Sequence, residues 1–127
     1  MDIGKRYHMQ FIFNIICFIP FMIVDMRIYT CKPGRMAEWV ALYEKEAWPL
    51  QKQYLGNCLG WYTSIEGRLH QVVHLWGYES QADREQRRGA MAKDPAWHAF
   101  LAKAKDIGAF VAQENSILSP SAFSLEK

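Results

Sequence analysis

Hydrophobic and polar residues alternate along four short stretches of the chain, at residues 23–30, 59–65, 71–78 and, more weakly, 109–118. Alternation with a period of two is typical of a β-strand, whose side chains point to opposite faces in turn. Glycine, proline and asparagine interrupt the chain between these stretches. The clearest breaks are Lys32-Pro33-Gly34, Gly56-Asn57 and Glu66-Gly67-Arg68. The pattern predicts four strands, and the short break after residue 65 predicts that the second and third form an antiparallel hairpin.

Between the strands, hydrophobic residues recur at steps of three and four, the spacing of one face of a helix. From residue 35 to about 54 this stripe comprises Met36, Val40, Tyr43, Ala47, Leu50 and Tyr54. Pro49 removes a backbone donor, which predicts a kink or a restart near Ala47. Ser80 and Asp83 have the spacing of a capping box, and Asp94-Pro95 that of a helix start. We therefore expect two further helices, the second ending at Gly108.

The order of these elements is that of the split β-α-β-β-α-β, ferredoxin-like pattern of the α+β class, with an antiparallel sheet. Helices cover one face of such a sheet, and a broad uncovered apolar face is unusual for a monomer. A second copy of the chain would bury it. The pattern thus predicts a homodimer in which two sheets close into a dimeric α/β barrel.

Residues 1–21 differ from the rest, because Lys5 and Arg6 precede an apolar run. One interpretation is a signal peptide or anchor, but no small-residue cleavage site follows, and Asn14 and Pro20 interrupt a run too short to span a bilayer. A second is that translation starts at Met22, and a third is an added structural segment. We expect one domain at residues 22–127, with an N-terminal extension outside it and membrane attachment disfavoured.

Composition narrows the functional classes. The net charge of +2 is too small to indicate a nucleic-acid partner. The three cysteines form no CxxC pair, which indicates reduced thiols and a cytoplasmic location. We expect no cofactor, because nucleotide-binding and hydrolase motifs are missing from the sequence. We expect no metal site either, because His70 and His74 would lie about 13 Å apart along one strand.

Several separate motifs, in order, resemble the NIPSNAP family from Met22 to the C-terminus. They are Met22-Ile23-Val24-Asp25, Lys32-Pro33-Gly34, the run from Gln71 to Trp76, the run from Ser80 to Arg84, Asp94-Pro95-Ala96-Trp97 and the run from Gln113 to Pro120. The resemblance implies a dimeric α+β barrel. The family has no agreed catalytic mechanism, so the resemblance carries no catalytic residues across, and fold kinship with quinol monooxygenases transfers no activity.

The third strand carries the candidate chemistry, because Val72, His74, Trp76 and Tyr78 share one face. This face suits the wall of a pocket better than a helix-packing surface, so we expect it to line the interior that two sheets enclose. His74, with an ordinary pKa near 6.5, is the candidate acid, base or hydrogen-bonding group. Trp76 would stack on a flat ligand. A histidine satisfied by hydrogen bonds within the dimer is the structural alternative.

Three further residues are candidates for ligand binding. Arg27 would hold an anionic group, or pair internally with Asp25 or Glu114, since a buried arginine needs a partner. Tyr29 and Asn115 would add hydrogen bonds. Arg84, Arg87 and Arg88 form either an anion patch or a solvated helix face.

Two functional hypotheses follow. The first is a barrel that binds a small organic molecule, with a cofactor-independent reaction on a flat or aromatic compound as its catalytic form. The second is a non-catalytic homodimeric binding or structural module whose interior is simply packed.

Overall fold

The computed structural model describes residues 23–125, and the N-terminal extension considered above lies outside this range. Its elements are β1 (Ile23–Cys31), α2 (Met36–Leu42), the π-helical turn η1 (Tyr43–Ala47), α3 (Trp48–Tyr54), β2 (Cys58–Thr63), β3 (Gln71–Tyr78), α4 (Gln81–Ala92), α5 (Pro95–Ile107), β4 (Phe110–Leu118) and the 3-10 turn η2 (Ala122–Leu125). This is the predicted β-α-β-β-α-β order, in which α2, η1 and α3 make up the first helical region and α4 and α5 the second.

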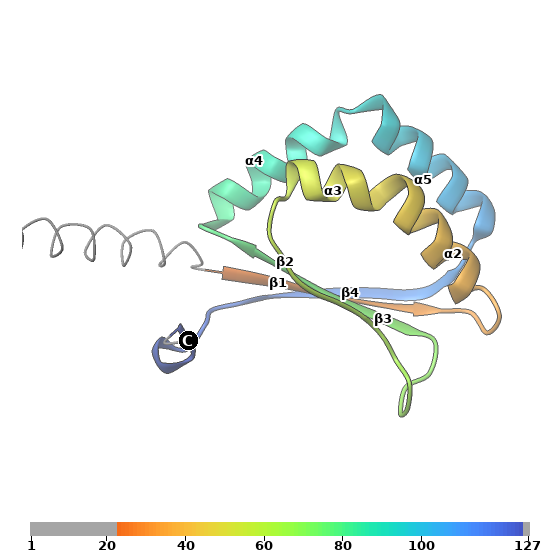
Figure 1. The fold of residues 1–127 in the computed structure, drawn as a ribbon, viewed down its shortest axis with the longest axis horizontal. Coiled ribbons are helices and arrows are strands. Elements are labelled where there is room, and N and C mark those ends of the chain that lie inside the picture. The colour runs from red at the N-terminus through yellow and green to blue at the C-terminus, as the bar shows by residue number, and fades with distance from the viewer. Residues whose placement is uncertain (1–22, 126–127) are drawn as a thin grey trace, which may run out of the picture.

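The four strands form one antiparallel sheet in the order β2-β3-β1-β4, and the helices lie together on one side of it (Figure 1). The predicted hairpin of β2 and β3 is confirmed. A bulge between Cys58 and Gly60 breaks the alternation expected for β2, and Leu59 is exposed. The α+β ferredoxin-like fold is therefore confirmed.

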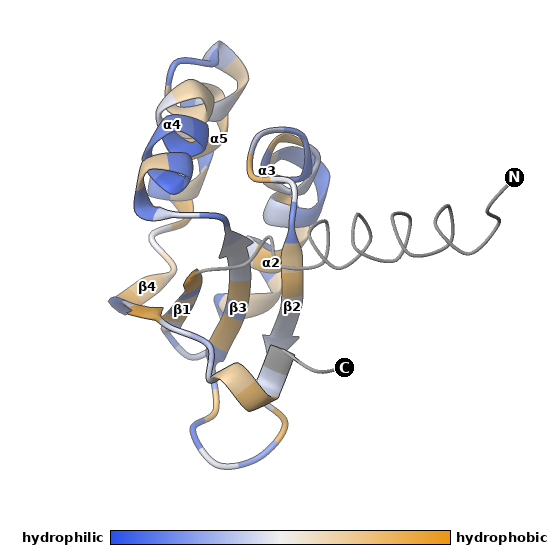
Figure 2. Ribbon diagram, turned by 90° about the vertical axis from the view of Figure 1, so that its left-hand side faces the viewer, coloured by the Kyte–Doolittle hydropathy of each residue, from blue (hydrophilic) through white to orange (hydrophobic). Residues whose placement is uncertain are grey.

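The helices cover the face of the sheet that carries His74, which contradicts the prediction that this face is unsuited to helix packing. Val72, His74, Trp76 and Tyr78 are all buried, and Val72 packs in one cluster with Trp39 of α2. On the inner strands β1 and β3, the open face carries the aliphatic residues Val24, Met26, Ile28, Val73 and Leu75, and Glu114 and Ser116 of β4 lie beside them. In Figure 2, hydrophobic colour runs along parts of β1, β2 and β3, and hydrophilic colour along much of α4. Alternation shows which residues share a face, but it does not show on which face the helices lie.

The region from α2 to α3 buries residues at intervals of four, which include Tyr43 and Ala47 of the predicted stripe but not its other members. The buried positions are Trp39, Tyr43, Ala47, Gln51 and Leu55. A regular α-helix has 3.6 residues per turn, so a stripe of strict fours needs wider turns. The π-helical turn η1 supplies one, because its hydrogen bonds span five residues. The predicted irregularity near Ala47 is thus present, and it turns Gln51 inward.

The helix ends follow the predicted caps. The Ser80 hydroxyl accepts from the Asp83 amide at 3.0 Å, and the Asp83 carboxylate accepts from the Glu79 amide at 3.1 Å. Asp94 accepts from the Ala96 amide at 2.8 Å, directly before Pro95. Gly108 ends α5 in the left-handed conformation, with a φ of 58°. These local signals fix where α4 and α5 begin and where α5 turns back into β4.

Two glycine substitutions should have opposite effects on the free energy of unfolding. Gly108→Ala should lower it by about 1 kcal/mol, because an L side chain is strained in the left-handed region. Gly89→Ala, in the interior of α4 with open space around the added Cβ, should raise it by about 0.5–1 kcal/mol. Urea unfolding of both variants measures this, and equal effects would contradict the assigned helix end.

Candidate functional site

The buried carboxylate of Asp25 organises the polar residues between the sheet and the helices. Its side chain is fully buried, and Oδ2 accepts from Arg84 Nε of α4 at 2.9 Å and from Arg27 at 3.2 Å. Oδ1 accepts from the Asn115 side-chain amide of β4 at 3.3 Å. Burial alone would raise the pKa of Asp25, but the Arg84 hydrogen bond, the Arg27 charge and the Asn115 hydrogen bond outweigh it and lower the pKa. Asp25 is therefore ionised, and it is the internal partner of Arg27.

His74 and Trp76 form a buried hydrogen-bonded pair on β3. The Trp76 indole N–H donates to His74 Nδ1 at 2.8 Å. Because Nδ1 accepts, the neutral imidazole carries its proton on Nε2, a tautomer inferred from this hydrogen bond. Nε2 is buried and has no partner within residues 23–125. The pair therefore presents one unused donor, surrounded by the rings of Tyr29, Tyr43 and Trp61.

The His74 imidazole has a pKa lowered from 6.5 to about 3, first because of burial and then because of the charge of Arg27. Arg88 lowers it further, and Asp25 only partly opposes the shift. The expectation that His74 exchanges a proton near neutral pH is therefore wrong for this environment. At pH 7 the ring is neutral and its free position can only donate a hydrogen bond.

A cavity of about 200 Å³ lies between the sheet and the helices. Half of its lining residues are aromatic, and they come from β1, β4, α2, η1 and α5. These are Tyr29, Trp39, Tyr43, Trp97, Phe100 and Phe110. Arg27, Gln51, Arg88 and Gln113 add polar groups, and Leu101 and Ala104 complete the lining. We call this space the inner cavity.

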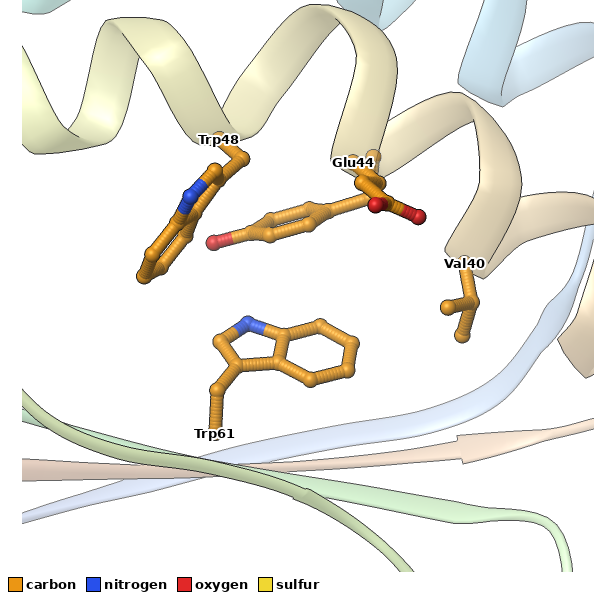
Figure 3. Close-up of a pocket in the computed structure, with 5 residues that line it drawn as sticks. Val40, Glu44, Trp48 and Trp61 are labelled. Carbon is orange, nitrogen blue, oxygen red and sulfur yellow. The ribbon is translucent and has the colours of Figure 1, made fainter.

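A second hollow of about 260 Å³ lies on the other side of Tyr43, which lines both spaces. Figure 3 shows Trp48 and Val40 projecting from the helical side and Trp61 facing them from the sheet. Glu44 is its one charged lining residue and is exposed. The inner cavity is the stronger candidate site, because polar groups that converge on an apolar wall give a ligand orientation and specificity.

The structure brings two of the five predicted ligand-binding residues to the inner cavity. Arg27 and Tyr29 line it, and Arg27 Nε donates to the Tyr29 hydroxyl at 2.9 Å. His74 lies behind Tyr29, with ring centroids 5.1 Å apart. Trp76 and Asn115 do not line the cavity. Trp76 donates a hydrogen bond to His74, and Asn115 donates one to Asp25.

Sequence reasoning missed most of the cavity wall. Neither Gln51 nor Trp39 belongs to the predicted helix stripe, and both are buried in the structure. Arg88 belongs to the group of three arginines for which an anion patch was one interpretation. In the structure these arginines have three different surroundings. Arg84 pairs with buried Asp25, Arg87 pairs with Asp83 at the surface, and Arg88 lines the cavity.

Metal-ligand groups and membrane-spanning helices are both absent from the part of the chain that the structure describes. Residues 23–125 contain no group of three or more His, Cys, Asp and Glu side chains that could hold a metal ion. Within the same range, no helix has both the length and the apolar character needed to cross a bilayer.

The pKa of His74 predicts a pH dependence of stability. Between pH 6.5 and about 3 the unfolded imidazole binds a proton and the folded one does not, so the free energy of unfolding falls as pH falls. From pH 7 to pH 5 this contribution is about 2 kcal/mol. Asp25 makes no such contribution between pH 7 and pH 5, because its stabilisation is lost only as pH falls from the ordinary pKa of 3.8 through its lowered pKa.

Urea unfolding at pH 7 and pH 5 tests this with two variants. His74→Gln should flatten the dependence by about that amount. His98→Gln, on the exposed side of α5, should leave it unchanged. Equal slopes in the His74 and His98 variants would contradict a buried neutral imidazole.

The chain is similar to proteins of one family. The NIPSNAP family model matches residues 24–125. A NIPSNAP family protein from Agrobacterium tumefaciens shares 40% identity and a TM-score of 0.75, over 80% of this chain and 94% of that one. An uncharacterised NIPSNAP-like domain protein from Burkholderia xenovorans shares 37% identity and a TM-score of 0.74, over 80% and 86%.

More distant similarity is informative about fold alone. A Streptomyces coelicolor monooxygenase, solved in complex with Nanaomycin D, has a TM-score of 0.57 at 13% identity, over 80% of this chain and 89% of that one.

Animal relatives are longer than this chain. The NipSnap protein of Drosophila melanogaster is 35% identical over 63% of this chain, which spans 29% of that protein's length. A NipSnap protein of Caenorhabditis elegans is 29% identical over 83% of this chain and 19% of its own length. The family match over almost all described residues, together with the shared fold, shows that the chain belongs to the NIPSNAP family.

Proposed function

We propose that this protein binds a small, flat organic molecule in the inner cavity, between the helices and the sheet. The observation that carries the proposal is the aromatic wall with polar groups converging on it. Tyr29, Trp39 and Phe110 already contact one another edge to face or tilted, with centroids 4.8–5.9 Å apart. Such rings offer large rigid contact surfaces to a planar ligand at low entropic cost.

The volume of the cavity limits the size of the ligand. A cavity of about 150 Å³ holds benzene, whereas drug-sized ligands occupy about 300 Å³ or more. The inner cavity, at about 200 Å³, has room for one ring and a small substituent. The proposed ligand is therefore a single-ring compound.

The inner cavity supports binding better than catalysis. A general base needs proton affinity near the working pH, and the pKa of His74 is about 3. The described lining residues include no carboxylate, imidazole or thiol. Cofactor-independent chemistry would therefore rely on N–H donors that stabilise negative charge forming on the bound molecule. We therefore favour a non-catalytic binding module. A cofactor-independent enzyme that uses these N–H donors is the second candidate function.

Filling the inner cavity should abolish ligand binding without unfolding the protein. Ala104 lines the cavity from α5, and the ring of an Ala104→Phe variant would occupy it. Ala102→Phe, on the exposed side of the same helix, is the matched control. We expect benzamide, a neutral single-ring probe, to shift the indole N–H resonances of Trp39 and Trp97 in the wild type and the control, but not in Ala104→Phe.

Two results would overturn this proposal. One is the absence of any resonance shift in the wild type at millimolar benzamide. The other is equal binding by Ala104→Phe, with thermal unfolding curves showing that the variant is folded.

We also infer that a second copy of the chain covers the open face of the sheet. Met26 and Leu75 lie opposite each other at its centre, on the two inner strands β1 and β3. Beyond β4, the chain passes to the same side as the open face (Figure 1), and Phe123 there is 80% exposed. An apolar patch on the inner strands, with Glu114 and Ser116 of β4 at its side and an exposed aromatic nearby, is typical of a protein–protein interface.

A charge on the open face should separate the two copies. Leu75→Arg would place a guanidinium opposite apolar side chains, so sedimentation should report one subunit where the wild type gives two. Ala99→Arg, on the exposed surface of α5, should sediment like the wild type. A wild-type protein that sediments as a single subunit would contradict the inferred homodimer.

A further inference from the structure

We propose that the ligand of the inner cavity is an aromatic carboxylate, with its carboxylate between Arg27 and Arg88 and its ring against Tyr29, Trp39 and Phe110. This inference deepens the proposed function and rests on it, because it assigns a charge and a chemical class to the flat molecule.

The charges between the sheet and the helices do not balance. Arg27 and Arg84 share the single carboxylate of Asp25. Arg88 is half-buried and pairs with no carboxylate among residues 23–125. Three guanidinium groups thus accompany one carboxylate in a region of low dielectric constant. A partly buried guanidinium is costly unless it is paired, so the region favours an added anion.

His74 reports the same positive potential. Both Arg27 and Arg88 oppose its protonation and help to lower its pKa. A neutral imidazole carries no charge, so it does not compensate the excess positive charge of the arginines. Burial is the largest cause of the shift, but the two arginine contributions show that both guanidinium groups act on the same enclosed space.

The hydrogen-bonding groups of the wall are mostly donors. Trp39 is 3% exposed, and its indole N–H has no acceptor within the described residues. Arg27 and Arg88 are obligate donors. The side-chain carbonyl of Gln51 already accepts from the Tyr43 hydroxyl. A carboxylate matches this surface because it only accepts, and it can receive two parallel N–H bonds from a guanidinium.

Three probes separate charge recognition from ring recognition. Benzoate carries both the ring and the negative charge, benzamide has nearly the same shape without the charge, and acetate has the charge without the ring. We expect calorimetric titration to show benzoate binding roughly tenfold or more tightly than either of the others. Raising the salt concentration should reduce this advantage only modestly, because the charges are partly buried.

Arg88→Gln should remove the advantage of benzoate while leaving benzamide affinity within about twofold. Arg87→Gln is the matched control, since Arg87 is the adjacent residue on α4 and pairs with Asp83 at the surface. Arg88→Lys should retain part of the preference, because it keeps the charge but loses the paired donors. Arg88→Gln should also unfold at the same or a higher temperature without ligand, since it removes repulsion from Arg27.

The outcomes distinguish this inference from the proposed function. If benzamide binds as tightly as benzoate, the cavity binds rings but the assigned charge is wrong. If acetate binds as tightly as benzoate, the site recognises anions and the aromatic assignment is wrong. If none of the three binds, both the proposed function and this inference fail. If Arg87→Gln weakens benzoate as much as Arg88→Gln does, the effect is a general surface charge and the inference is overturned.

Discussion

The buried carboxylate of Asp25 holds the sheet and the helical layer in one arrangement. It lies on an inner strand and accepts from Arg84 of α4, 59 residues away, and from Asn115 of the edge strand β4, 90 residues away. Breaking a buried ion pair by removing one partner typically costs about 3–5 kcal/mol, because the other charge remains buried. Such an interaction therefore selects one packing of α4 on the sheet.

The same carboxylate explains why the inner cavity is polar on one side. The single negative charge of Asp25 is already shared by Arg27 and Arg84, so it does not also neutralise Arg88. His74 is kept neutral by burial and by the arginines, and Trp76 fixes its tautomer. The residues that sequence analysis selected for direct ligand contact thus divide into two roles. Arg27 and Tyr29 reach the cavity, whereas His74, Trp76 and Asn115 set the geometry and charge of the groups that do.

The fold followed from local signals, and most of the site did not. Alternating strands, a capping box at Ser80 and a left-handed Gly108 are each encoded within a few residues. The buried positions of α2 and α3 depend on a π-helical turn, whose extra residue per turn no spacing rule for a regular helix anticipates. The prediction that the His74 face lies away from the helices was wrong, because alternation shows only which residues share a face. The polar and aromatic residues of β3 were compatible with either side of the sheet. Arg88 could be told from Arg87 only once the direction of α4 was known.

The position of the cavity also separates binding from assembly. The sequence linked them, because it placed His74 and Trp76 in an interior that two sheets would enclose. In the structure, the inner cavity lies between the sheet and the helices of the same chain, and residues of both layers line it. The open face is occupied by different residues, and Met26 and Leu75 point away from Arg27 and His74 because neighbours along a strand alternate. Dimerisation through that face would therefore stiffen the floor of the cavity without contributing to its wall. The proposed ligand preference would then depend on one chain alone, because Asp25 pairs with Arg27 and Arg84 and leaves Arg88 without a carboxylate partner among residues 23–125.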